Sequence, residues 1–119
     1  QLISRWQCMS GKSGLLHTGH YLMSLDNIKS NINSISLNKC CEGVVSTKIE
    51  FMSLSNIEIV KYASTSEPFN CAGGFAIEGY GGLFIKQIDG CFSNVIGLSL
   101  PWLKTNLEKL GLSELLLNI

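Results

Sequence analysis

One acidic side chain, Glu78, lies within the most glycine-rich stretch of the chain, residues 67–90. Half of the twelve glycines fall there: Gly73, Gly74, Gly79, Gly81, Gly82 and Gly90. Such a cluster is costly in backbone entropy unless positive φ or a close backbone approach is needed. A carboxylate on bare backbone, with room for a ligand, is typical of metal and phosphate sites. The alternative is a glycine-rich turn between two strands with an ordinary exposed glutamate.

Cys71 and two histidines are the other side chains that could do chemistry. No His or Lys neighbours Cys71 in sequence to lower its pKa, which favours a packed thiol over a nucleophile. His17 and His20 stand three residues apart in a predicted strand, so they should lie on opposite faces. This spacing favours hydrogen-bonded strand histidines over a joint metal site, a single ligand or a base.

The composition predicts one globular domain without bulk charge. Of 119 residues, 45% are apolar and 15% are charged, and nine Lys or Arg balance nine Asp or Glu. Binding of nucleic acid or of an anionic membrane through bulk charge is therefore not expected. No apolar run approaches the roughly 18 residues of a membrane span. The first residues also lack the apolar core of a signal peptide.

The cysteines indicate a reducing compartment. The chain has five, an odd number, and none forms a C-x-x-C pair that would suit zinc. An adjacent pair, Cys40-Cys41, is a poor start to a disulfide framework. We therefore expect reduced cysteines and a cytoplasmic protein.

In its first half, the chain has the pattern of a helix followed by a hairpin. Leu2, Trp6 and Met9 recur at helical spacing before Gly11. Ser13–Leu25 and the alternating Val44–Met52 are predicted strands, and we expect them to pair antiparallel. The Asn- and Ser-rich segment Asp26–Gly43 would form the tip, and its apolar residues could extend the arms: Ile28, Ile32, Ile35 and Leu37.

In the second half, the pattern predicts a helix, the glycine stretch, a strand and a last helix. Ser55-Asn56-Ile57-Glu58 is a capping box that begins a helix, and Pro68 ends any continuation. Leu83–Ile88 is predicted to be a buried strand. Pro101 suits the first turn of the last helix, whose apolar face and end are Leu103, Leu107, Leu110 and Gly111. This order predicts an α/β or α+β sheet with helices on its faces.

Four blocks of sequence resemble the Maf-like nucleotide pyrophosphatases, also known as septum formation inhibitor proteins. They are residues 67–79, 82–85, 88–90 and 93–101, with Ser10-Gly11-Lys12 and His17-Thr18-Gly19 upstream. Together they extend over nearly the whole chain. The resemblance implies an α/β fold like that of the inosine triphosphate pyrophosphatases: a mixed sheet with flanking helices and a cleft between two lobes.

The resemblance also implies a function. The family hydrolyses nucleoside triphosphates, including non-canonical ones, to the monophosphate and pyrophosphate with a divalent metal, Mg or Mn. Glu78 matches a position that is Gln in one subgroup and Glu in another, which implies a catalytic role and metal binding. Gly73, Gly74 and Gly79 would contact substrate. Together with Cys71, Glu78 resembles the Glu-bearing subgroup, which implies modified purine nucleotides such as 7-methyl-GTP.

The chain departs from the family pattern at its beginning. The family starts with a Ser/Arg-rich phosphate loop, an acidic metal site and a Gly-Lys-Pro segment, and none of these is present. Residues 1–119 would then form a single incomplete Maf-like domain, its C-terminal portion, with the N-terminal part missing. We expect this fragment alone to be inactive. The alternatives are a catalytically dead nucleotide-binding or regulatory fragment and a nonfunctional remnant.

An incomplete domain would also expose surfaces that are normally covered. Unpaired sheet edges favour association, which makes a homodimer one assembly to expect. Apolar surface should be exposed as well, and Trp6, Leu15 and Phe75 are the residues expected to carry it.

Overall fold

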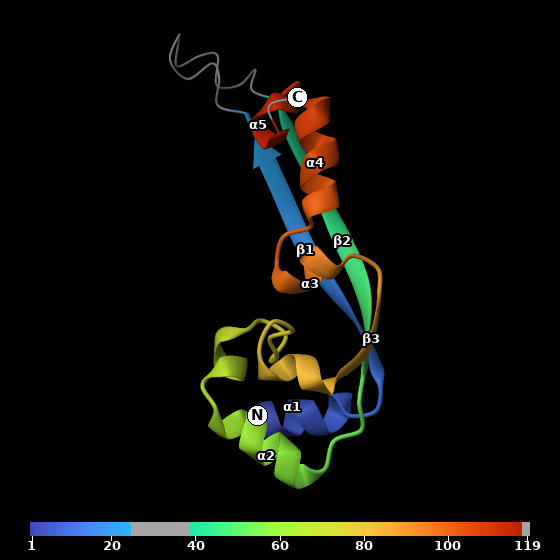
Figure 1. Ribbon diagram of the computed structural model, residues 1–119, viewed down its shortest axis with the longest axis vertical. Coiled ribbons are helices and arrows are strands. Elements are labelled where there is room, and N and C mark those ends of the chain that lie inside the picture. Colours follow the sequence, from blue (N-terminus) through green and yellow to red (C-terminus); the bar gives the residue numbers. More distant parts are fainter. Residues whose placement is uncertain (25–38, 118–119) are drawn as a thin grey trace.

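The computed structural model describes residues 1–24 and 39–117. The molecule is elongated, with extents of 59 × 27 × 21 Å. A long hairpin forms its axis (Figure 1). Helices α1 and α2 lie with the glycine-rich stretch at one end of the hairpin, and α4 and α5 lie at the other.

Antiparallel pairing builds a sheet of order β1-β2-β3. β1 (Ser13–Met23) pairs with β2 (Cys40–Phe51) from Ser13↔Glu50 to Met23↔Cys40. The predicted antiparallel hairpin is therefore confirmed, although β2 begins four residues before Val44. The four apolar residues proposed to extend the arms lie outside the described residues: Ile28, Ile32, Ile35 and Leu37.

The third strand differs from its prediction. β3 (Ile85–Asp89) pairs antiparallel with β2, with a register shift between Glu50 and Phe51. Residues Tyr80–Phe84, part of which was predicted to be strand, form the short 3-10 helix η3 instead. No residue of β3 is fully buried, because β3 lies at the edge of the sheet. The prediction of a buried strand over Leu83–Ile88 was wrong in its start and in its burial.

Most helices follow the predicted signals. α1 (Leu2–Met9) and α2 (Asn56–Ser64) are present, and the α2 capping box has both bonds: Glu58 N–H to Ser55 Oγ (3.2 Å) and Ser55 N–H to the Glu58 carboxylate (2.8 Å). The short helix α3 (Phe92–Ile96) was not predicted. α4 (Leu100–Lys109) has Pro101 in its first turn, and α5 is Glu114–Leu117. None of the described helices is long and apolar enough to cross a membrane.

The core at the α1 end is built around Trp6, which is fully buried. Its indole N–H donates to the carbonyl of Gly74 at 2.8 Å, which ties α1 to the glycine-rich stretch. Aromatic rings from four segments pack edge-on against it, with centroids 5.6–6.4 Å away: Phe51, Tyr62, Phe75 and Phe84. Edge-on packing is a preferred aromatic geometry and adds to the energy of burial.

The expected exposure of apolar surface is confirmed at one residue only. Leu15 is 64% exposed, whereas Trp6 is fully buried and Phe75 is 7% exposed. The expectation was wrong for Trp6 and Phe75, because α2, the end of β2 and η3 supply the rings that enclose them.

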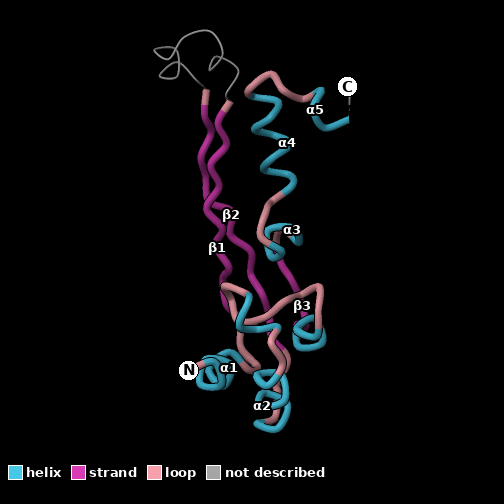
Figure 2. The backbone as a smooth tube through the Cα atoms, turned by 90° about the vertical axis from the view of Figure 1, so that its left-hand side faces the viewer, coloured by secondary structure: helices cyan, strands magenta, loops and turns pink. Residues whose placement is uncertain are grey.

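A polar network attaches α3 and α4 to the hairpin, alongside which they lie (Figure 2). The fully buried amide of Asn94 donates to the carbonyl of Val45 and to Thr47 Oγ1, both at 3.0 Å. Further along β1, His20 Nε2 accepts a bond from the Ser99 N–H at 2.9 Å. His20 Nδ1 therefore carries the proton and donates to the carbonyl of Thr18 at 3.0 Å. The His20 ring packs against Trp102, with centroids 4.8 Å apart.

Replacement of Trp6 by Ala should destabilise the chain strongly. The change removes the ring at the centre of the aromatic packing and leaves the Gly74 carbonyl without its donor, so we expect a loss of about 3–5 kcal/mol in the free energy of unfolding. Urea denaturation followed by circular dichroism measures it. Ile57→Ala, at a side chain 68% exposed on α2, is the control and should change stability by less than about 1 kcal/mol. Equal losses in both variants would contradict a core centred on Trp6.

Candidate functional site

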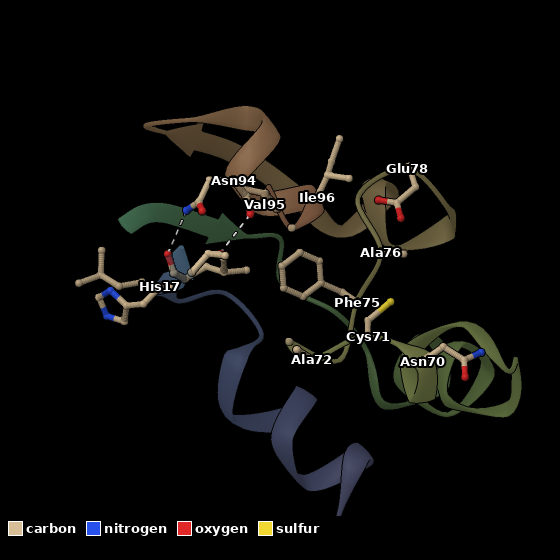
Figure 3. A pocket seen from close by; sticks show the side chains of 16 residues that line it. His17, Asn70, Cys71, Ala72, Phe75, Ala76, Glu78, Asn94, Val95 and Ile96 are labelled. Atoms are coloured by element: carbon tan, nitrogen blue, oxygen red, sulfur yellow. Dashed lines mark hydrogen bonds between the residues drawn. The ribbon is translucent and has the colours of Figure 1, made fainter. Parts of the chain in front are cut away.

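A cleft of about 660 Å³ lies between β1, the segment of residues 71–79 and α3 (Figure 3). We call residues 71–79, which join the 3-10 helix η2 (Glu67–Asn70) to η3, the glycine loop. Residues 15–19 of β1 form one wall, and residues 94–97 of α3 and its end form another. The third wall comes from Asn70 and from the glycine loop, including Gly73, Phe75 and Glu78. Clefts of this size hold small molecules in many proteins.

The cleft offers one acid and no strong base. Among the described residues that line it, Glu78 is the single acidic side chain, and none is Lys or Arg. The remaining lining is mostly apolar or backbone, with Thr18 and Asn70 among the polar groups. His17 also lines the cleft, where its ring is bonded to Ser46. A polyanionic ligand would need most of its charge met by groups from outside this lining, because these walls hold no Lys or Arg.

A second acid, Glu67, shapes the loop without lining the cleft. One of its carboxylate oxygens accepts the Tyr80 N–H at 2.9 Å, and the other accepts the Gly81 N–H at 3.0 Å. The hydroxyl of Tyr62 donates to Glu67 and accepts the Ala76 N–H at 3.2 Å. These bonds hold the backbone on both sides of Glu78.

The Tyr62–Glu67 pair has a defined protonation state. Burial and the bond to Glu67 raise the pKa of Tyr62 well above its usual range. Partial burial alone would raise the pKa of Glu67, but the bonds from Tyr62, Tyr80 and Gly81 outweigh it and lower that pKa. At neutral pH the pair is thus a neutral phenol donating to a carboxylate.

Close packing explains most of the glycines. A side chain at Gly79 would place its Cβ 1.9 Å from Glu67 Oε1, and one at Gly81 would lie 2.7 Å from the Tyr62 hydroxyl. Gly74 has a positive φ of +81° and lies against α1, where its Cβ would be 3.3 Å from Leu2. Of the three glycines expected to contact substrate, only Gly73 lines the cleft. Gly74 and Gly79 are required by packing against α1 and Glu67.

Cys71 and the histidines have the environments of packed groups. Burial raises the pKa of Cys71, the charges of Glu78 and Glu67 raise it further, and its thiol donates to the Glu67 carbonyl at 3.5 Å. A protonated thiol supports the packed interpretation over the nucleophile. His17 and His20 lie on opposite faces of β1, as predicted: His20 is buried, while His17 is exposed and bonded to Ser46 Oγ at 2.6 Å.

The described residues do not fit a divalent metal by themselves. In residues 1–24 and 39–117, no three His, Cys, Asp or Glu side chains gather where they could hold a metal ion. Glu67 has its oxygens occupied by backbone and phenol donors, which leaves Glu78 as the one carboxylate in the cleft. A divalent cation needs several oxygen ligands. We therefore derive no chemistry here through a bound metal.

Comparison with known proteins decides the family. The family model described as "Maf-like protein" matches residues 1–110. The chain belongs to this family. It is 81% identical over 118 residues to a Nucleoside triphosphate pyrophosphatase of Prochlorococcus marinus strain NATL1A, and 80% identical to that of strain NATL2A. A third, from strain SARG of the same organism, is 55% identical over 113 residues.

The Maf-like chain spans about half the length of these relatives. The alignments include 99% of this chain but 56% of the NATL1A and NATL2A proteins, and 95% of this chain but 54% of the third. The α/β fold expected from the resemblance is confirmed as a partial Maf-like fold: three antiparallel strands with helices packed against them.

Sequence reasoning missed three residues that shape the site: Tyr62, Glu67 and Asn94. Glu67 and Asn94 form hydrogen bonds mainly with backbone groups. Because almost every residue type has these groups, the sequence does not show which residues will be the partners. The available signal was the position of Glu67 at the start of the glycine-rich stretch, because a turn of bare backbone exposes N–H groups from which an acid can accept hydrogen bonds.

Stability below pH 4.5 should depend on Glu67. The pKa of Glu67 is lower in the folded chain than its ordinary value of 4.5. Its bonds therefore contribute fully to the free energy of unfolding above that pH. The contribution is lost as the pH falls through the folded pKa, where protonation removes an acceptor. Glu67→Gln should flatten this part of the stability curve, measured by urea denaturation at a series of pH values. Glu114→Gln, at an exposed acid, is the control; parallel curves for wild type and Glu67→Gln would contradict the assignment.

Proposed function

We propose that this chain supplies one wall of the active site of a nucleoside triphosphate pyrophosphatase, which hydrolyses non-canonical or modified nucleotides to the monophosphate and pyrophosphate. The observation that carries the proposal is the cleft with its single carboxylate, Glu78, in a chain 81% identical to a relative of that printed name. Because the chain spans 56% of that relative, the rest of the active site would come from the remaining part of a complete domain.

The chemistry assigns Glu78 an orienting role. Cleavage between the α- and β-phosphates requires a water directed at the α-phosphorus and stabilisation of the charge on the leaving pyrophosphate. The Glu78 carboxylate accepts hydrogen bonds, so it suits a water or a substrate N–H. It repels bare phosphate. The charge on the pyrophosphate would be met by cations or an Mg or Mn ion held outside the described lining of the cleft.

The same carboxylate favours a modified purine as substrate. Guanine presents N–H donors on its Watson–Crick edge, which a carboxylate accepts better than a neutral amide does. Methylation at N7 adds a positive charge to the ring, which Glu78 would attract. The apolar side chains of the cleft, including Leu16, Phe75 and Val95, would pack against the base. A nucleotide such as 7-methyl-GTP fits this combination.

A second candidate is a nucleotide-binding fragment without catalysis. The lack of Lys and Arg among the described residues lining the cleft favours it for the chain on its own. For either candidate we propose a cytoplasmic location. We also propose a homodimer as one assembly, since β1 is an edge of the described sheet and carries the exposed Leu15.

Replacement of Glu78 should reduce hydrolysis in a complete domain. We would build a chimera in which this chain replaces the matching 118 residues of the NATL1A relative. Glu78→Ala should lower kcat/KM for 7-methyl-GTP about a hundredfold or more, because one placed electrostatic group is lost. Glu78→Gln should lose less if the residue orients by hydrogen bonding. Pyrophosphate release measures both.

Two controls accompany this experiment. Glu114→Gln, at an exposed acid far along the chain, should keep the wild-type rate. The chain alone should bind the nucleotide without releasing pyrophosphate under either candidate. Release of pyrophosphate by the chimera is what separates the enzyme from the binding fragment. Wild-type rates in both Glu78 variants would show that Glu78 has no part in the reaction.

A further inference from the structure

We propose that Glu67 is a positioning residue for Glu78: through its bonds to Tyr62 and to the Tyr80 and Gly81 N–H groups, it sets where the Glu78 carboxylate stands in the cleft. The inference rests on the proposed function, since it concerns the same site. Glu67 itself does not line the cleft, so its effect on a ligand would pass through the loop.

The bonds of Glu67 bracket Glu78 on both sides. The Tyr80 and Gly81 N–H groups, at 2.9 and 3.0 Å from the Glu67 oxygens, fix the backbone just after Glu78. Tyr62, which donates to Glu67, also accepts the Ala76 N–H at 3.2 Å and fixes the backbone just before it. Within this turn the backbone adds a bond from the Gly79 N–H to the Ala76 carbonyl at 3.2 Å. Bonds to an ionised group are the stronger kind, so the carboxylate is the main restraint.

Gly79 leaves the room that the Glu67 carboxylate occupies next to the loop. The nearest Glu67 oxygen stands 1.9 Å from where a Cβ of Gly79 would lie, so the carboxylate occupies the space that a side chain would fill. Because Gly79 follows Glu78 directly in the chain, Glu67 can approach the backbone next to Glu78. Glu67 does so without lining the cleft, so the cleft beside Glu78 stays open to a ligand.

The carboxylates of Glu67 and Glu78 also differ in what they can still bind. Its oxygens are occupied by three donors, from Tyr62, Tyr80 and Gly81, which keep it ionised and leave it little capacity to bind water or substrate. Glu78 is exposed and lines the cleft. One acid therefore holds the turn while the other meets the ligand.

A glutamine at position 67 cannot replace this acid. All three partners are donors, so the amide NH₂ of Gln must face at least one of them and that bond is lost. Glu67→Gln keeps the size of the side chain and changes only its hydrogen-bonding character. Tyr62→Phe removes the bond from Tyr62 and the link to Ala76 but leaves the two backbone bonds, so its effect should be smaller.

A double-mutant cycle in the chimera tests the coupling. We expect Glu67→Gln to lower kcat/KM for 7-methyl-GTP about tenfold in the wild-type background. In the Glu78→Ala background, the same change should have little further effect, since Glu67 acts through Glu78. A residue that merely stabilises the fold would lower both backgrounds by the same factor, and that result would overturn the proposal.

A second measurement does not depend on activity. Amide hydrogen exchange of residues 76–82, followed by NMR in this chain, should become faster in Glu67→Gln by a larger factor than exchange in the hairpin. Unchanged exchange in residues 76–82 would overturn the proposal even if the chimera has no pyrophosphatase activity. An inactive wild-type chimera with faster loop exchange in the variant would refute the proposed function but support Glu67 as the residue that holds the loop.

Discussion

The hydrogen bond from the Trp6 indole to the Gly74 carbonyl joins the start of the chain to the loop that carries the candidate site. The ring of Trp6 packs at the same time against the end of β2, α2 and η3, through Phe51, Tyr62 and Phe84. Gly74 reaches this bond in a positive-φ conformation that suits glycine. Without Trp6, the Gly74 carbonyl would have no donor, and the surrounding aromatic rings would lose the ring against which they pack.

Two buried side chains, Tyr62 and Asn94, then hold opposite walls of the cleft in place through their hydrogen bonds. Tyr62, part of the packing around Trp6, donates to Glu67 and so links the core to the turn that carries Glu78. On the other wall, the amide of Asn94 reaches acceptors on both β1 and β2, the carbonyls of Leu16 (3.5 Å) and Val45 (3.0 Å), which seats α3 on the hairpin. The cleft is therefore defined by contacts between residues far apart in the sequence.

Local signals allowed much of the fold to be predicted. The alternation in Val44–Met52 and the capping box at Ser55 act over a few residues, and both elements formed where expected. Glu78 was singled out because it is the acid inside the glycine cluster, and it lines the cleft. The exposure of Leu15 was also foreseen.

The remaining features depend on long-range packing. α3 has five residues, too few for an apolar period to emerge. The strand predicted over Leu83–Ile88 began too early, since the glycines before it allow the 3-10 turn of η3. Glu67 was passed over because its acceptor role depends on backbone N–H groups of Tyr80 and Gly81, which the sequence does not mark. Likewise, the glycine cluster suggested room for a ligand, whereas Gly79 makes room for Glu67.

The central claim is that the cleft between β1 and the glycine loop receives the nucleoside, and that Glu67 holds Glu78 in place through the backbone of the loop. A crystal structure of the chimera with a non-hydrolysable α,β-methylene analogue of 7-methyl-GTP tests it most directly. The account predicts the base in this cleft, a hydrogen bond between the base and the Glu78 carboxylate, and Glu67 still bonded to the Tyr80 and Gly81 N–H groups. A nucleotide bound elsewhere, with no part of it in this cleft, would contradict it.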